Sequence, residues 1–486
     1  MRNLNRLVPF VLLMLLTLPG CVGPTGPQRS GIDAPLSWNA LPGGAAGATL
    51  QAPLSGDPEA EVDHQWWHHF GDPTLDLLIT EALANNKTLQ IAKARVEEAR
   101  AGRGAAEARL YPEVNASASA QRGNQGYATN NQAVGIAGVN LEASWQLDLF
   151  GRNRARAAEA GAIWQSVAAS QRAVRVGLLV EVARNYFELR NSERQLSLTR
   201  QNLETQIKTL ELVRAQMRGG LASDFDVQRA GAQVSTTEAL LPSWEAARDA
   251  ARNRLNVLLG YPPGTRDGVL ATARELKPLD HGILVAAPAK ILAARPDVAV
   301  AERNFAASIS AQKAAKTELF PDISLTALFG AQASTPFSAT PWGFGINLVQ
   351  PVLNFGAIKS RIAAADSRQV QAFLQYQQSV LEALADMENA LSGYLHETTR
   401  NASLLKGVEQ NRKAAELATE QYRNGYTGLL DVLVAVRNRL DAEASLAASD
   451  ATLRSDLVNI FAAAGGGWQD EKATGAGKAK KTTQPE

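Results

Sequence analysis

Three of the chain's five histidines stand close together near the N-terminus, where their ring nitrogens could ligate a metal ion. His64, His68 and His69 follow Glu61 and Asp63, and positions 64 and 68 are one helical turn apart. They precede the repeated part of the chain described below, so an exposed surface segment accounts for them better than a metal site. We expect no metal, no cofactor and no catalytic residues, and the chain is not predicted to be an enzyme.

Cys21 is the only cysteine. It follows two arginines within residues 1–6, an apolar run at Leu7–Leu18, and then Pro19-Gly20. The run is too short to span a membrane stably and is typical of a secretory signal peptide. Leucine three residues before the cysteine and glycine directly before it match a bacterial lipobox. The pattern predicts cleavage after residue 20 and lipidation of Cys21, with an S-diacylglycerol group and an N-palmitoyl chain.

An ordinary signal peptide with a chance cysteine is the alternative interpretation of this segment. A lone cysteine elsewhere in the chain would weaken the lipoprotein interpretation, but the chain has none. Val22 stands where lipoprotein sorting rules would place an aspartate for retention in the inner membrane, so we expect an outer-membrane location. Several acyl chains together would anchor the protein firmly, whereas one would not.

Composition narrows the classes of function further. The 486 residues carry 49 Lys and Arg against 48 Asp and Glu, without the basic excess of a nucleic-acid binder. A single cysteine excludes internal disulfides and a cysteine-ligated zinc site. Glycine runs such as Gly465–Gly467 lack the context of a phosphate-binding loop. With 45% hydrophobic but only 6% aromatic residues, the chain favours long helices packed by small side chains.

The chain contains one internal repeat, visible as three matches in the same order. Leu110-Tyr111-Pro112-Glu113 returns 209 residues later as Leu319-Phe320-Pro321-Asp322, and Asp148-Leu149-Phe150-Gly151 returns 205 residues later as Leu353-Asn354-Phe355-Gly356. Arg218-Gly219-Gly220-Leu221 returns, again after 205 residues, as Arg423-Asn424-Gly425-Tyr426. We interpret residues 72–260 and 289–464 as two copies of one unit.

The sequence pattern of each copy predicts a helix, a strand pair, a very long helix and a return helix, in that order. Apolar and polar residues alternate at about 114–122, 135–148, 323–332 and 342–351, which predicts strands with one apolar face. Leucine and valine then recur every seven residues, a coiled-coil-like seam: Val182, Leu189, Leu196, Leu203 and Leu210. The long helices are expected at about 151–217 and 356–422, each about 100 Å long. The return helices are expected at about 223–259 and 429–461, the first interrupted by Pro242.

The remaining segments are predicted to be connections. Residues 21–71 are expected to form a lipid-anchored arm, and the turn-rich residues 261–288 to link the copies irregularly. A Gly/Lys/Thr-rich stretch suggests a disordered tail over residues 465–486.

Four strands cannot cross a bilayer alone, because open sheet edges would leave backbone groups unsatisfied in lipid. If the strands are membranous, several chains must share one closed barrel. Three chains would supply twelve strands and a hollow interior. Two soluble hairpins packed on helices are the alternative.

The repeat order resembles that of the TolC-like outer-membrane efflux proteins, in particular the NodT or OprM-like lipoprotein branch. The resemblance covers Trp66 to about Ala464. It is carried by several motifs that are weak singly and strong in order: Trp66-Trp67 with Phe70-Gly71-Asp72-Pro73-Thr74-Leu75, Trp145-Gln146-Leu147-Asp148-Leu149-Phe150-Gly151, Arg295-Pro296-Asp297-Val298, Phe320-Pro321-Asp322-Ile323, and Tyr422-Arg423-Asn424-Gly425 with Leu430-Asp431-Val432-Leu433.

The resemblance implies a mainly α fold with a membrane β-barrel: a homotrimer whose twelve-stranded barrel in the outer membrane continues as a periplasmic α-helical barrel. It implies the exit duct of a tripartite, RND-type efflux system that passes drugs or other small molecules. The implied partners are a periplasmic membrane-fusion adaptor, an inner-membrane pump and outer-membrane lipid, with no nucleic acid. Gly219, Gly220 and Gly425 are the turn motifs of the repeats.

The resemblance also implies a constriction just after the second glycine turn. Leu430 and Arg437 stand where the family commonly has a leucine and an arginine, but Val434 replaces the usual carboxylate. A valine ring would close by apolar contact and dewetting rather than by binding cations. Asp431 is the nearest carboxylate, and its first-copy counterpart Asp226 suggests a structural role at the turn instead.

Two other functions fit part of the sequence. A non-conducting coiled-coil lipoprotein would explain Cys21 and the long helices, but not the strand pairs that recur in both copies. The outer-membrane channel of a protein secretion system would use the same architecture. The exported molecules and the particular adaptor and pump do not follow from the sequence.

Overall fold

The computed structural model describes residues 29–41, 54–57, 60–124, 133–271, 283–334 and 337–468. Cys21 lies outside these residues. The chain divides into two compact units. The first comprises Met1–Ile32, Ala94–Ala169 and Ala299–Gln378, and the second comprises Asp33–Lys93, Ser170–Val298 and Ser379–Glu486.

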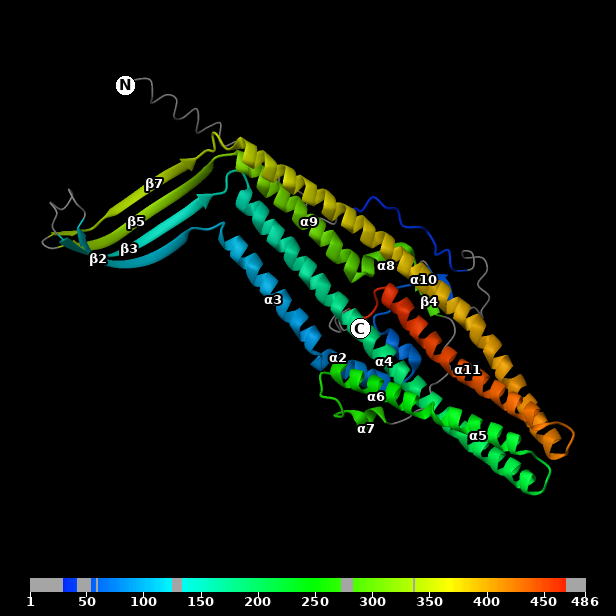
Figure 1. The fold of residues 1–486 in the computed structure, drawn as a ribbon. Coiled ribbons are helices and arrows are strands. Elements are labelled where there is room, and N and C mark those ends of the chain that lie inside the picture. The colour runs from blue at the N-terminus through cyan, green and yellow to red at the C-terminus, as the bar shows by residue number, and fades with distance from the viewer. Residues whose placement is uncertain are drawn as a thin grey trace, which may run out of the picture. The chain divides into compact units, whose positions relative to one another are not determined.

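The two copies have the expected order of elements (Figure 1). The first copy contains α2 (Pro73–Asn85), α3 (Lys87–Ala108), β2 (Glu113–Asn124), β3 (Ala133–Leu147), α4 (Arg152–Arg218), α5 (Asp224–Glu238) and α6 (Leu241–Leu258). The second contains α8 (Pro288–Ala294), α9 (Pro296–Lys316), the 3-10 turn η5 (Thr317–Leu319), β5 (Asp322–Ser334), β6 (Phe337–Ala339), β7 (Trp342–Val349), α10 (Phe355–Arg423) and α11 (Leu429–Ala463). The return helix of the first copy is divided beside Pro242, as predicted, because proline removes a helical hydrogen bond.

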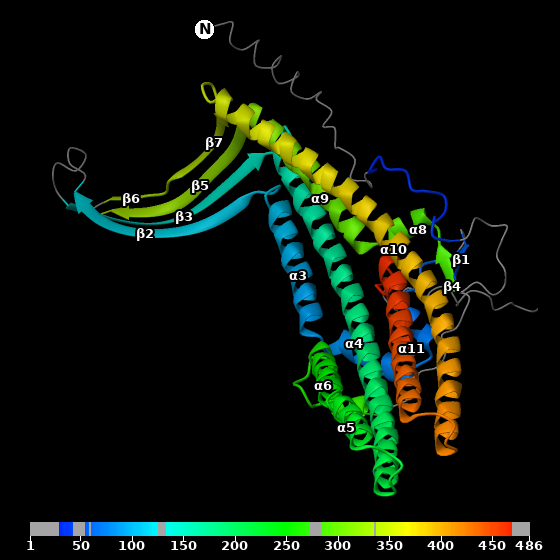
Figure 2. The same cartoon turned by 45° about the vertical axis from the view of Figure 1, so that its right-hand side comes forward.

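One antiparallel sheet in the first unit combines the strands of both copies in the order β2-β3-β5-β7 (Figure 2). β3 and β5 pair over twelve residues, from Ile136 opposite Ser334 to Leu147 opposite Ile323. The base of the sheet is tied by an ion pair, in which Arg152 at the start of α4 donates to both carboxylate oxygens of Asp322 at 2.6 and 2.7 Å. The junction between the copies is therefore both hydrogen-bonded and ionic.

The core of the second unit is built around the buried part of α4. Four of the five seam positions are buried, namely Val182, Leu189, Leu196 and Leu210, as the seven-residue spacing predicted. Tyr186 and Phe187 lie between them and are almost fully buried. Trp66, which is fully buried, stacks on Phe461 of α11 with ring centroids 5.5 Å apart.

Three segments that we expected to be irregular or exposed contain regular structure or buried residues. The connecting segment contains α7 (Asp267–Leu270) and β4 (Ile283–Ala286). β4 pairs in parallel with β1 (Leu54–Asp57), which lies in the expected arm. A strand of only four residues is too short for its hydrophobic alternation to be recognised in the sequence, so neither β1 nor β4 could be predicted.

The expected surface segment around the histidines contains the 3-10 turn η3 (Trp66–Phe70). Trp66, Trp67 and Phe70 are buried, while His68 and His69 remain exposed. The described chain also continues past residue 465, where we expected a tail. Trp468 donates from its indole nitrogen to the carbonyl of Ala294 at 2.8 Å, and Gly465–Gly467 are buried. A side chain at Gly466 would meet the carbonyl oxygen of Asp63 at 2.3 Å, so this glycine is required by a close backbone approach.

None of the helices in the described part of the chain has both the length and the hydropathy needed to cross a membrane.

Candidate functional site

The turn at the end of each helical hairpin is closed by the same hydrogen-bond pattern. The N–H of Leu221 donates to the carbonyl of Gln216 at 2.8 Å, and that of Tyr426 to the carbonyl of Gln421 at 2.8 Å. Each is the long bond of a Schellman motif, which needs a left-handed residue just before the donor. Gly220 and Gly425 supply it with φ of +75°, whereas the predicted turn residue Gly219 has no positive φ.

Side chains then start the return helices. Ser223 and Asp226 form a reciprocal capping box at the start of α5. These hydrogen bonds lower the pKa of the Asp226 carboxyl below its usual value. In the second copy Asp431 accepts a hydrogen bond from the hydroxyl of Thr427. Both aspartates thus act locally at their turns.

Leu430, Val434 and Arg437 lie on one exposed face of α11. Leu430 and Val434 are 46% and 49% exposed, and the Arg437 side chain is 71% exposed. The buried face of the same turns contains Leu429, Val432 and Val436. A spacing of four and then three residues places the exposed side chains in line along the helix. Leu430 and Val434 therefore form a short apolar strip on the exposed face of α11.

The end of the first hairpin is also apolar, which the sequence analysis missed. Leu221 and Phe225 are 83% and 70% exposed, and Tyr426, the counterpart of Leu221, is 84% exposed. Phe225 stands 205 residues before Leu430, so the repeat offset could have identified it. Both hairpin ends therefore present large apolar side chains.

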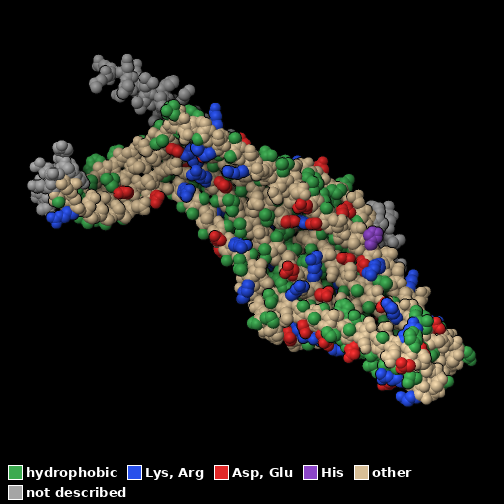
Figure 3. Space-filling view, in the orientation of Figure 1, with side chains coloured by type: hydrophobic (Ala, Val, Ile, Leu, Met, Phe, Trp, Pro, Cys, Tyr) green, Lys and Arg blue, Asp and Glu red, His purple; other side chains and the backbone are tan. Residues whose placement is uncertain are grey.

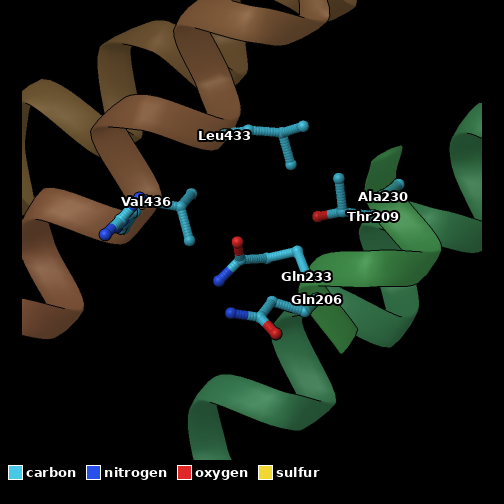
Figure 4. Close-up of a pocket in the computed structure, with 7 residues that line it drawn as sticks. Gln206, Thr209, Ala230, Gln233, Leu433 and Val436 are labelled. Carbon is cyan, nitrogen blue, oxygen red and sulfur yellow. The ribbon is translucent and has the colours of Figure 1, made fainter. Parts of the chain in front are cut away.

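Two hydrogen bonds join the hairpins toward their turns. Gln195 of α4 donates to the carbonyl of Ala444 in α11 at 2.9 Å, and Tyr422 of α10 donates its hydroxyl to the side-chain oxygen of Gln216 in α4. Burial, followed by the nearby charge of Asp226, raises the pKa of the Tyr422 hydroxyl, so it remains protonated as a donor at neutral pH. Between these bonds lies a small cavity (Figure 4), which is described below.

The motif residues away from the hairpin ends have structural partners. Arg295 is 8% exposed and donates to Asp297, to Asp386 and to the carbonyl of Ala463. Asp72 caps α2 by accepting from the N–H of Thr74 at 2.9 Å, and it also accepts the hydroxyl hydrogen bond of Tyr186. These motifs stabilise the fold rather than forming a reaction site.

The histidines do not converge on a metal site. His68 pairs with Asp76 at 2.9 Å and His69 with Asp63 at 2.7 Å, while His64 accepts a hydrogen bond from the N–H of Gly467. Across the ranges that the structure describes, no three His, Cys, Asp or Glu side chains are grouped closely enough to hold a metal ion.

The sheet has one apolar and one polar face. Most cross-strand partners in the central part of the sheet are of one kind, although Glu142 lies opposite Leu328 and Gln121 opposite Ile136. Apolar rows are Ala116, Leu141, Phe329 and Trp342; Val114, Ala143, Ala327 and Phe344; and Trp145, Leu325 and Ile346. Polar or glycine rows are Ser117, Asn140 and Gly330, and Gln146, Ser324 and Asn347.

The apolar rows are open to the surroundings. Phe344, Ile346 and Trp342 are 84%, 76% and 72% exposed. In the view of Figure 3, few charged side chains lie on the strands, whereas the helices carry many. Exposed apolar area of this extent, continuous across strands, is typical of a surface that contacts lipid or another protein.

Comparisons with known proteins identify the family of this chain. The model of the family described as outer membrane efflux protein matches residues 78–261 and, a second time, residues 287–466. The chain belongs to the outer membrane efflux protein family. The double match coincides with the two copies, so the predicted repeat is confirmed. Members of this family are channels of the outer membrane, and they are not enzymes.

Individual relatives cover nearly the whole chain. Nodulation protein T of Rhizobium leguminosarum bv. trifolii is 30% identical over 92% of this chain and 94% of its own length. The pyoverdine export outer membrane protein OpmQ of Pseudomonas putida is 30% identical over 96% and 98%. The solved outer-membrane channel OprN is similar with a TM-score of 0.83 and 31% identity, covering 92% of this chain and all of that one. The predicted fold class, efflux role and outer-membrane location are confirmed.

Proposed function

We propose that this protein is the exit duct of a tripartite, RND-type efflux system, passing drugs or other small molecules from the periplasm to the exterior. The observation that carries the proposal is the four-stranded sheet with an exposed apolar face, continuous with two long helical hairpins. The relative named for pyoverdine export supports an export role for small molecules.

The functional assembly is a homotrimer. In the described chain, β2 pairs only with β3 and β7 only with β5, so each has a free outer edge. Free edges in lipid would leave N–H and C=O groups unsatisfied, which closure into a barrel prevents. Pairing β7 of one copy with β2 of the next joins three copies into twelve strands, with the apolar rows toward lipid and the polar rows toward the interior.

The hairpin ends contact a periplasmic membrane-fusion adaptor, and through it an inner-membrane pump. Leu221 and Tyr426 support this step, because their large side chains are more than four-fifths exposed at the turns. Tyrosine is enriched among the residues that contribute most to the affinity of protein interfaces, and neighbouring apolar side chains such as Leu221 help to exclude water there.

Leu430, Val434 and Arg437 narrow the periplasmic end of the duct. In a trimer, three copies of one exposed α11 face can approach a common axis, and Leu430 and Val434 then form apolar rings. Such rings obstruct water and ions by dewetting. Asp431 is bound to Thr427 and contributes to the turn.

Lipidation of Cys21 holds the duct in the outer membrane. Part of the arm beyond it is firmly bound: the carboxylate of Glu388 accepts from the N–H of Asn39 at 2.7 Å and from the N–H of Ala40 at 2.9 Å. Mass spectrometry of the purified protein should find a mature N-terminus at an acylated Cys21, and an unmodified cysteine would exclude the anchor.

The function is tested by deletion and complementation. Loss of the gene should increase sensitivity to several drugs, and the intact gene should restore resistance. A changed set of secreted proteins with unchanged drug sensitivity would instead favour the protein-secretion alternative.

A further inference from the structure

The cavity between the hairpins lies where α4 and α5 face α11 (Figure 4). The first hairpin lines it with Gln206, Thr209, Ala230 and Gln233, and the second with Leu433, Val436 and Arg437. Its volume is about 10 Å³, which is the space of one water molecule. In the view of Figure 4, the side chains of Gln206 and Gln233 extend from the first hairpin toward Val436 of the second.

Gln206 presents an unsatisfied amide to this cavity. Its side chain is 4% exposed, and neither its Oε1 nor its Nε2 has a hydrogen-bond partner among the described residues. Buried amides nearly always have partners, either in the protein or in ordered water. Gln206 therefore requires a ligand that fits the cavity.

Two other glutamines of α4 at the contact between the hairpins differ from Gln206 in their hydrogen bonding. Gln195 and Gln216 lie roughly three helical turns before and after it, so the three amides share one face of α4. Gln195 bonds to Ala444, and Gln216 to Tyr422, both in the second hairpin. At the level of Gln206 the second hairpin presents Leu433, Val436 and Arg437, and none of them is hydrogen-bonded to the Gln206 amide.

The chemistry of the amide selects the ligand. Gln206 has both an acceptor and a donor to satisfy, and one water molecule can bond to both. A halide would leave Oε1 unsatisfied. A cation would leave Nε2 unsatisfied and would also meet the positive charge of Arg437, which is a lining residue.

We propose that this cavity is a structural water site, and that its water eases the separation of the α4–α5 and α10–α11 hairpins when the proposed aperture opens. Separating a hydrated contact exposes less apolar surface than separating a dry one, so it opposes motion less. The role in motion rests on the proposed duct, whose aperture residue Arg437 adjoins the cavity. The water site itself does not depend on it.

The water site is tested by a crystal structure of the full-length protein at a resolution that shows ordered water, together with bromide-soaked crystals. We expect a water within about 3.2 Å of both Oε1 and Nε2 of Gln206, and no anomalous bromide peak. A direct protein partner for the Gln206 amide, or a bromide peak in the cavity, would overturn the site.

The role in motion is tested with Gln206→Leu, whose side chain matches the aliphatic surface of α11. We expect a higher melting temperature and loss of channel openings in planar bilayers relative to the natural protein. Gln228→Leu, at an exposed position of α5, is the matched control and should change neither. If Gln206→Leu fails to assemble, Gln233→Leu provides the same test, because it replaces the cavity-lining amide of α5. Unaltered opening in both variants overturns this role, whereas a natural protein that never conducts refutes the duct itself.

Discussion

Gly220 and Gly425 adopt the same left-handed backbone conformation, each with φ of +75°, at equivalent turns of the two copies. No atom lies within 4 Å of a β-carbon built on either glycine, so space is not what selects glycine there. The requirement is conformational, because an L-residue in this region costs roughly 1–2 kcal/mol.

Gly425→Ala should therefore lower the stability of the protein by about 1 kcal/mol, seen as a lower melting temperature in detergent. Gly407→Ala is the matched control, since Gly407 lies within α10, without a positive φ and with no atom near its β-position. Alanine favours a helix interior, so this control should be neutral or stabilising. Equal melting temperatures for the two variants would contradict the conformational explanation.

Charge on the apolar face of the sheet should prevent assembly in the membrane. Ile346→Arg places a cation in an apolar row and should cost about 2–4 kcal/mol if that row faces lipid. We expect loss of trimer from outer-membrane fractions. Asn347→Arg, one residue along on the polar face, should assemble normally. Equal amounts of trimer from both would show that the apolar rows do not contact lipid.

Smaller, polar side chains at the proposed constriction should widen it. Leu430→Ser combined with Val434→Ser removes both apolar rings, so water can fill the aperture. We predict higher single-channel conductance and increased sensitivity of cells to vancomycin. Leu405→Ser, at a residue of α10 that is also exposed but distant from the turn, is the control. Unchanged conductance and vancomycin sensitivity in the double variant would place the constriction elsewhere.

Acid should weaken the Arg295–Asp297 interaction. Burial raises the pKa of Asp297, but the hydrogen bonds and charge of Arg295 outweigh it, so the pKa is below its usual value. A carboxyl whose pKa is depressed in the folded state stabilises the protein above the unfolded pKa, near 4, and loses that contribution as pH falls through the folded pKa. The melting temperature should therefore fall below about pH 4.

Asp297→Asn removes this titration, so its melting temperature should already be lower at neutral pH and should fall less on acidification. Asp441→Asn, at an exposed carboxylate, should follow the natural protein throughout. The interaction does not contribute if Asp297→Asn and the natural protein lose stability in parallel between pH 6 and pH 3.

The helices and strands of the repeats could be predicted from the sequence because their hydrophobic periodicity continues over many residues. The seven-residue seam through Leu189 and Leu196 extends over several turns, and α4 ends within one residue of the predicted boundary. Strand alternation likewise located all four long strands. Because the chain repeats, the pattern in one copy supported the prediction of the corresponding element in the other.

The sequence was less informative where contacts join distant segments. The pairing of β1 with β4 depends on residues more than two hundred positions apart, and each strand has only four residues. The burial of Trp66 and the docking of Trp468 likewise depend on partners that no local pattern reveals. The exposed face of α11 was identified through the family motif, whereas the cavity at Gln206 arises from two helices whose register is visible only in the fold.

The central claim is that the protein forms a passage, and planar-bilayer recording of the purified protein tests it most directly. We predict discrete single-channel conductance from the natural trimer, increased by Leu430→Ser with Val434→Ser and absent from Ile346→Arg. A correctly assembled trimer that inserts into the bilayer and carries no current would contradict the account and would favour a structural lipoprotein.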